Sequence, residues 1–194
     1  MAHRLEVPAV AKIKAGSTTM AEVEKVFGRP NETVAGSDSR TVARYFFREL
    51  HVSRDVSPYE RREHPGDILF RTLSLRYAPG PVIEDKRHDE SVTPIHRYNG
   101  WYVAGPAVAP ENLMFIHRNK TKVAELVEHL GEPTSRTFDT DGAEMLIWFS
   151  VKARRDRLAD AEVRRLIVQV TDRHVVKDYA VVSHDLPSVS GSFR

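Results

Sequence analysis

An internal repeat is the feature that most constrains how this chain of 194 residues can fold, since two copies of one segment should form the same local structure. Residues 26–30 recur as residues 129–133, so that 103 positions separate Gly28 from Gly131. The same offset pairs Ile13 with Ile116, Thr18 with Thr121, Glu22 with Glu125, Val23 with Leu126, and Tyr45-Phe46 with Trp148-Phe149. This agreement in apolar type and in Gly/Pro positions predicts a tandem duplication.

The offset falls to 93 residues in the later part of each copy. Here the matching positions are Leu73, Leu75 and Tyr77 with Leu166, Val168 and Val170, followed by residues 82–85 with residues 175–178. The extra length of the first copy lies in the polar segment 53–66, and surface loops tolerate such insertions. The change of offset therefore fits a duplication with one loop of unequal length.

Each copy predicts a helix pair followed by three strands. A proline opens the first helix, over residues 8–14 and 110–117, because proline is tolerated in a first helical turn. An amphipathic helix follows, which Thr19 and Glu22 should cap reciprocally in the first copy, and Gly28 or Gly131 should end it. Strands are expected from residues 41–50 and 144–151 and from the apolar alternation after them. The predicted fold class is α+β, with two tandem α-α-β-β-β units, each a helix pair packed on a three-stranded antiparallel sheet.

We expect three regions: a first repeat over residues 1–92, an aromatic linker over residues 93–109, and a second repeat over residues 110–194. The linker contains Tyr98, Trp101 and Tyr102, which are more aromatic residues than a flexible tether needs. They either pack between the two halves or form an aromatic binding patch, since Tyr and Trp often anchor interfaces.

Composition excludes several classes of protein. A net charge of +2 and a pI near 8.9 lack the dense cationic stripe of a nucleic-acid binder, so we expect no nucleic-acid partner. The chain has no cysteine, which excludes disulfides and thiolate chemistry. No apolar run reaches the about 20 residues of a membrane helix, and the first residues carry no apolar signal segment. Either the protein is cytoplasmic, or an export signal and lipid anchor lie outside this chain.

No catalytic, metal or cofactor site is expected from the polar residues. The histidines are scattered, without the His-x-x-x-His spacing of a helical zinc site. Asp139-x-Asp141-Gly142 resembles the start of a calcium loop, but it lacks the later ligands and fits a turn better. Ser183-His184-Asp185 is no triad, because triad members converge from separate segments, and the chain contains no phosphate loop. We therefore expect a protein that is not an enzyme.

The pattern Ile13-x-x-Gly16-x-Thr18-x4-Val23-x3-Phe27-Gly28-x-Pro30 resembles the signature of the SmpA/OmlA (BamE-like) lipoprotein domain. That family places a helix pair before a three-stranded antiparallel sheet, and residues 73–77 and 82–83 resemble its later strands. In the second copy, Asn119 replaces the glycine of the signature. The resemblance implies an exported envelope protein of a Gram-negative bacterium, periplasmic and associated with the outer membrane through an anchor outside this chain. It also implies binding to assembly proteins of the outer membrane or to another protein.

A two-copy arrangement of this unit also resembles the β-lactamase inhibitory proteins, in which two units form one broad concave sheet. Those proteins carry cysteines and this chain has none, so we carry over the architecture and not the target. The resemblance implies an alternative function, inhibition of a secreted or periplasmic enzyme. A further alternative is a small-ligand or enzymatic site between the halves, around Trp101.

The predicted function is a non-catalytic protein-binding module of the bacterial envelope. Its expected partner-binding residues are a polar sheet face and the aromatic linker: Arg44, Thr72, Ser74, Arg76, Tyr98, Trp101 and Tyr102. The basic run at residues 154–157, together with Arg164 and Arg165, is either a solvated loop and strand edge or a contact for an acidic partner or lipid headgroups.

Overall fold

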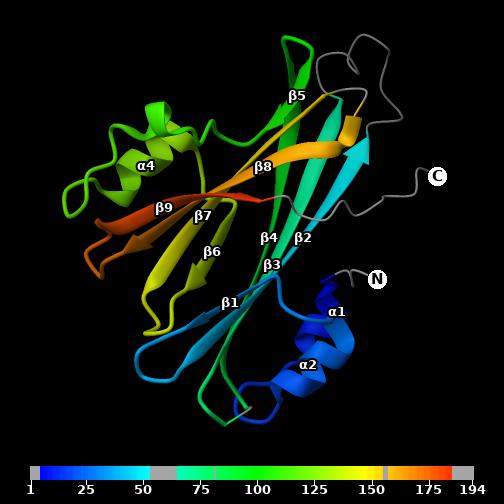
Figure 1. Ribbon diagram of the computed structural model, residues 1–194, viewed down its shortest axis with the longest axis vertical. Helices are drawn as coiled ribbons and strands as arrows, with labels where there is room; N and C mark the ends of the chain where they lie inside the picture. Colours follow the sequence, from blue (N-terminus) through cyan, green and yellow to red (C-terminus); the bar gives the residue numbers. More distant parts are fainter. Residues whose placement is uncertain (1–4, 53–64, 81, 155–156, 185–194) are drawn as a thin grey trace.

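The computed structural model describes residues 5–52, 65–80, 82–154 and 157–184. It is mostly β-sheet, with 53% strand and 16% helix. The strands form one nine-stranded antiparallel sheet in the order β1-β2-β3-β4-β5-β7-β8-β9, and β6 pairs with β7 beside this path. Figure 1 shows the helical segments at opposite corners, with α1 and α2 on one side of the strands and α4 on the other.

The elements follow one another in this order: α1 Val7–Ala11, α2 Met20–Phe27, β1 Glu32–Ala35, β2 Thr41–Val52, β3 Gly66–Tyr77, β4 Ile83–Tyr98, β5 Trp101–Ala104, a 3-10 helix η1 Pro110–Leu113, α4 Val123–Leu130, β6 Ser135–Phe138, β7 Glu144–Arg154, β8 Arg157–Val170 and β9 Val176–His184. None of the helices exceeds eight residues in the described part of the chain.

The predicted fold class is wrong. The structure is a single curled sheet with short helical segments, not two units in which a helix pair covers three strands. Residues 8–14 yield only the five-residue α1, and residues 110–117 contain a single 3-10 turn in place of an α-helix. Neither is long enough to hold an isolated helix together, so the sheet supplies most of the buried structure.

Several elements nevertheless recur at the offsets of the sequence repeat. The same 103 residues separate the first residues of α2 and α4, and those of β1 and β6. Tyr45 donates its hydroxyl to the carbonyl of Gly28 (3.1 Å), and Trp148 donates its indole Nε1 to the carbonyl of Gly131 (2.9 Å). These two hydrogen bonds join equivalent residues of the two copies. Each connects the end of an amphipathic helix, α2 or α4, to the second strand that follows it, β2 or β7.

The predicted capping box at Thr19 and the predicted chain breaks at Gly16 and Asn119 are confirmed. Thr19 and Glu22 form the expected capping box at the start of α2. Gly16 and Asn119 both have positive φ, 79° and 59°, a conformation that glycine and asparagine tolerate best. The amides of these two residues donate to the carbonyls of Ile83 and Val176, respectively, at 2.8 and 2.7 Å.

The curl of the sheet creates four layers. One core lies between α1, α2 and the outer face of β2 and β3, and a second lies between α4 and the outer face of β7, β8 and β9. A third core joins the inner faces of the two halves, with Ile68, Phe70 and Ile95 from one half and Ile147, Phe149 and Val163 from the other. The halves therefore pack face to face, in the layer order helix, sheet, sheet, helix.

Residues 93–98 and 101–104 of the stretch predicted to be a linker are strands of the sheet. β4 continues to Tyr98, and β5 returns from Trp101 and pairs with β7. Asn99 and Gly100 connect β4 to β5, with φ of 46° and 81°, as the two central residues of a type I′ hairpin turn require. The sheet thus runs from one half to the other through this hairpin, although the predicted boundaries at 92/93 and 109/110 stay a prediction.

No helix in the described residues is long and apolar enough to cross a membrane.

Candidate protein-binding surface

The structure separates the seven predicted partner-binding residues into two groups. Arg44, Thr72 and Ser74 are buried on the inner face of the sheet, with exposed fractions of 4%, 3% and 2%, and Arg76 beside them is half-buried. Tyr98, Trp101 and Tyr102 lie at the far end of the molecule, on the β4–β5 hairpin. The two groups therefore lie apart: the polar sheet residues are on the inner face and the three aromatic residues are on the hairpin.

The inner-face group forms a polar layer between the two halves. The hydroxyls of Thr72 and Ser135 lie 2.5 Å apart, and Thr137 donates its hydroxyl to that of Ser74 (2.6 Å). Each pair joins β3 of one half to β6 of the other. A buried hydroxyl needs such a partner because leaving it unpaired costs free energy. The polar alternation that predicted a solvent-facing strand thus marks a contact between two strands.

One carboxylate joins two buried arginines in the same layer. The same Oε2 atom of Glu32 lies 3.5 Å from Nη1 of Arg44 and 3.4 Å from Nη1 of Arg165. Arg44 also donates to the carbonyl of Phe138 (2.9 Å), and the guanidinium of Arg165 lies over the ring of Phe46 at 4.3 Å. Burial lowers the pKa of both guanidinium groups, and the charge of Glu32 opposes that shift.

The aromatic side of the inner face explains why the sheet is closed. The rings of Phe46 and Phe149 lie 5.7 Å apart, and Phe70 stacks on Phe149 at 4.9 Å. An open concave sheet would expose these rings to water, which is unfavourable in proportion to the apolar area. In this arrangement the face that the sequence assigned to a partner is covered by the other half of the same chain.

The second group is divided by the strand register of the hairpin. Tyr98 pairs with Trp101, and Trp101 pairs with Arg154, so these three side chains share one face of the sheet. Tyr102 points to the opposite face, where it packs against the inter-half core beside Ala104. Of the three predicted aromatics, Tyr98 and Trp101 therefore belong to a solvent-facing surface and Tyr102 supports it from behind.

We define the outer patch as the six residues that share this face on three adjacent strands. They are His96 and Tyr98 on β4, Trp101 and Val103 on β5, and Lys152 and Arg154 on β7. All six are exposed or half-buried, whereas Ile95, Ala104, Val151 and Ala153 on the opposite face are buried. The alternation of burial along the three strands shows that the outer patch faces solvent and that the opposite face is covered.

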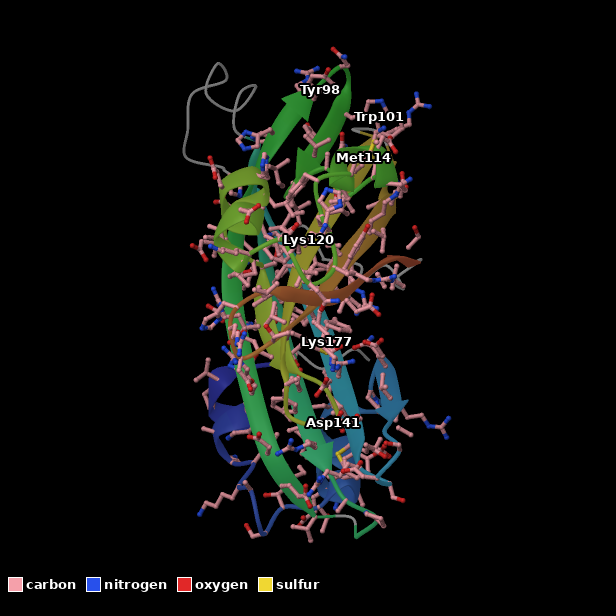
Figure 2. The ribbon with its side chains drawn as sticks, turned by 90° about the vertical axis from the view of Figure 1, so that its left-hand side faces the viewer. Tyr98, Trp101, Met114, Lys120, Asp141 and Lys177 are labelled. Atoms are coloured by element: carbon pink, nitrogen blue, oxygen red, sulfur yellow. The ribbon has the colours of Figure 1, made fainter. Side chains whose placement is uncertain are left out.

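Tyr98 is the most exposed aromatic of the outer patch, with 66% of its surface accessible. Trp101 is half-buried beneath two cations, with Lys152 Nζ at 4.6 Å and the Arg154 guanidinium at 5.9 Å from its ring centroid. Figure 2 shows Tyr98, Trp101 and Met114 at one end of the long axis, and Met114 is 78% exposed. An apolar and cationic surface thus occupies this end of the molecule.

Sequence reasoning missed His96, Val103 and Lys152 as neighbours of the aromatic residues. The signal that finds most of them is the dipeptide Asn99-Gly100 between two alternating runs, which predicts a two-residue hairpin. A hairpin over residues 95–104 places His96, Tyr98, Trp101 and Val103 on one face by simple counting. Lys152 comes from the distant strand β7, which no local pattern places beside the hairpin.

The other polar motifs have structural roles or lie partly outside the described residues. Asp139 accepts hydrogen bonds through Oδ1 from the amides of Asp141 (2.9 Å) and Ala143 (2.8 Å), which makes its motif a turn between β6 and β7. No group of three or more His, Asp or Glu side chains suited to a metal occurs among the described residues. Asp185 of the Ser-His-Asp run, and residues 155 and 156 of the basic run, lie outside them.

Comparison of the chain with family models, with curated proteins and with solved structures finds no match.

Proposed function

We propose that this protein is a non-catalytic protein-binding module and that it docks through the outer patch. The observation that carries the proposal is the exposure of Tyr98 on the same sheet face as Trp101, Lys152 and Arg154. Tyr, Trp and Arg are the residues that contribute most to binding at protein interfaces. Tyr98 leaves 66% of its surface in water, and a partner that covered this ring would bury that apolar area.

The support around the patch favours a preorganised interface. β4, β5 and β7 are hydrogen-bonded to one another along the patch, and Tyr102 and Ala104 anchor its reverse side in the inter-half core. A rigid strand surface loses little conformational entropy on binding. This supports docking by a surface that is already formed in the free protein.

We place this binding role in the bacterial envelope, in the periplasm at the outer membrane, on the resemblance of residues 13–30 to the SmpA/OmlA lipoprotein domain. A lipid anchor outside this chain is part of that proposal. Fractionation of cells that produce the native protein, with its intact mass, tests the setting. A soluble cytoplasmic protein of unmodified mass would contradict the envelope proposal and leave the binding proposal standing.

Site-specific photo-crosslinking tests the binding role. A photoreactive amino acid replaces Tyr98 in the full chain, in the cells that naturally produce it. Matched variants carry the same group at Lys120 or at Lys177, which are exposed and lie away from the hairpin end (Figure 2). We expect a discrete protein adduct from position 98 and none from the two controls.

A Trp101→Ala variant that still carries the photoreactive group at position 98 should lose the adduct. Its circular dichroism should remain that of the parent, because Trp101 is half-buried at the surface. The proposal is wrong if position 98 gives no adduct, or if all three positions give the same set of adducts.

A further inference from the structure

We infer that the segment of the partner that docks on the outer patch is acidic, with a carboxylate placed beside an apolar or aromatic side chain. This inference rests on the proposed function and names the chemistry of the partner. It follows from the charge of the patch and from the position of one ammonium group.

The charges of the outer patch have one sign. Its six side chains include two permanent cations, Lys152 and Arg154, and no carboxylate. Among the residues that the structure describes, the carboxylate nearest in register is Glu162 of β8, opposite Lys152. That carboxylate is already held by Arg164, whose Nη2 and Nε lie 2.5 and 2.6 Å from it.

Lys152 supplies the charge that a partner can use. Among the residues that the structure describes, it forms no ion pair within 4 Å, and its ammonium instead lies over the Trp101 ring. An ammonium is a strong hydrogen-bond donor with three N–H groups. A carboxylate from a partner would add a charge-assisted hydrogen bond without displacing a pair that already exists.

The same geometry fixes where the apolar part of the partner lies. Lys152 Nζ is 4.6 Å from the Trp101 centroid, so a carboxylate that pairs with it lies next to the indole. The next side chain of an acidic segment then meets Tyr98 and Val103, which lie on the same face across β4 and β5. Complementary charge at the rim of an aromatic contact mainly sets specificity and the rate of association.

A protein carboxylate fits this patch better than an anionic membrane. Attraction to an anionic leaflet takes a cluster of about four to eight Lys or Arg side chains. The outer patch holds two permanent cations, Lys152 and Arg154. One cation is enough to pair with one carboxylate of a protein segment, so the charge of the patch suits such a segment better than a leaflet.

The test pans a library of random peptides on phage against the full, immobilised chain. We expect the retained peptides to be enriched in Asp and Glu and to carry an apolar or aromatic residue beside the acid. A fluorescein-labelled copy of the strongest peptide then reports affinity by anisotropy. Lys152→Glu should weaken its binding by about tenfold, and Trp101→Ala by about thirtyfold.

Lys177→Glu is the matched control, since it makes the same charge change at an exposed β9 residue outside the patch. Its affinity for the peptide should stay within about twofold of the parent at physiological salt, where distant exposed charges are screened. A second arm measures binding to phosphatidylcholine vesicles that contain phosphatidylglycerol, and we expect none.

The inference is overturned if no peptide is retained, if the retained peptides show no excess of acids, or if Lys152→Glu and Lys177→Glu weaken binding equally. Vesicle binding that Lys152→Glu abolishes would identify a lipid headgroup in place of a protein carboxylate. Failure of the two proposals is distinguishable. If position 98 crosslinks to a partner and Lys152→Glu does not change that adduct, the inference of an acidic segment is wrong and the binding role stands. If position 98 gives no adduct, the proposed binding role itself is wrong.

Discussion

Glu32 lies between two buried guanidinium groups that come from different halves of the chain. Its carboxylate is 3.5 Å from Arg44 and 3.4 Å from Arg165, whose side chains are 5% and 1% exposed. Transfer of these cations from water is unfavourable unless an anion accompanies them. Glu32 therefore contributes to the stability of the contact between the halves.

Glu32→Ala should lower the free energy of unfolding by about 3 kcal/mol, because it leaves two buried cations without their shared carboxylate. Urea unfolding followed by circular dichroism measures the loss. Glu84→Ala is the control: its carboxylate pairs with Arg40 at 3.2 Å on the surface, and exposed pairs contribute about 1 kcal/mol or less. Equal losses in the two variants would show that the contact of Glu32 with Arg44 and Arg165 stabilises the fold no more than an exposed ion pair does.

Tyr45 makes stability depend on pH in the alkaline range. Burial raises the pKa of its hydroxyl, and the negative charge of Glu24 raises it further. The unfolded chain releases this proton near pH 10, whereas the folded chain retains it. The contribution of Tyr45 is therefore complete below pH 10 and falls as pH rises above it, by up to about 1.4 kcal/mol per pH unit.

Tyr45→Phe should remove this part of the alkaline loss. It should cost about 1 kcal/mol at pH 8, because the hydrogen bond to the Gly28 carbonyl disappears. Urea titrations of both proteins at pH 8 and at pH 11 measure the two effects. Parallel losses of stability between these pH values in both proteins would contradict the assignment to Tyr45.

At the scale of the elements, local signals predict caps and turns better than they predict what covers a strand. The capping box at Thr19 and the positive φ of Gly16 follow from residue type alone. The alternation around Leu73 correctly identifies a strand, but its polar side faces β6 and not water. Residues 93–109 read as a linker because their prolines and glycines outweighed the hairpin signal at Asn99-Gly100.

The end of β5 depends on a close backbone approach. Gly105 has a φ of 77°, and a Cβ atom there would lie 2.0 Å from the carbonyl oxygen of Phe149. Gly16 has nearly the same φ, 79°, but nothing lies within 4 Å of its Cβ position. The two glycines therefore separate the cost of backbone strain from that of a steric clash.

Gly16→Ala should cost about 1–2 kcal/mol, since only the left-handed backbone opposes the side chain. Gly105→Ala should cost roughly 3 kcal/mol or more, because β5 must also move away from β7. Thermal unfolding of the two variants beside the parent measures the difference. If Gly105→Ala were no worse than Gly16→Ala, the close contact with Phe149 would be wrong.

At the scale of the whole molecule, the decisive feature is that the sheet closes on its own inner face. Thr72 and Ser74 sit on the same face of β3 as Phe70 and Ile68, so one end of that face is polar and the other is aromatic. Sequence alternation shows that a strand has two unlike faces, but it does not show which layer covers each. A broad concave sheet was therefore expected, and the apolar end of the face instead draws the two halves together.

The most direct test of a partner on the outer patch is to lock the inner face shut. The hydroxyls of Thr72 and Ser135 lie 2.5 Å apart, and the chain has no cysteine, so Thr72→Cys with Ser135→Cys offers a single disulfide between the halves. The photoreactive group at position 98 then reports partner binding with and without reductant. Our account predicts the same adduct in both states, because the outer patch is open while the inner face is closed. An adduct that is lost in the oxidised protein and restored by reduction would contradict it, since the partner would then require the inner face to open.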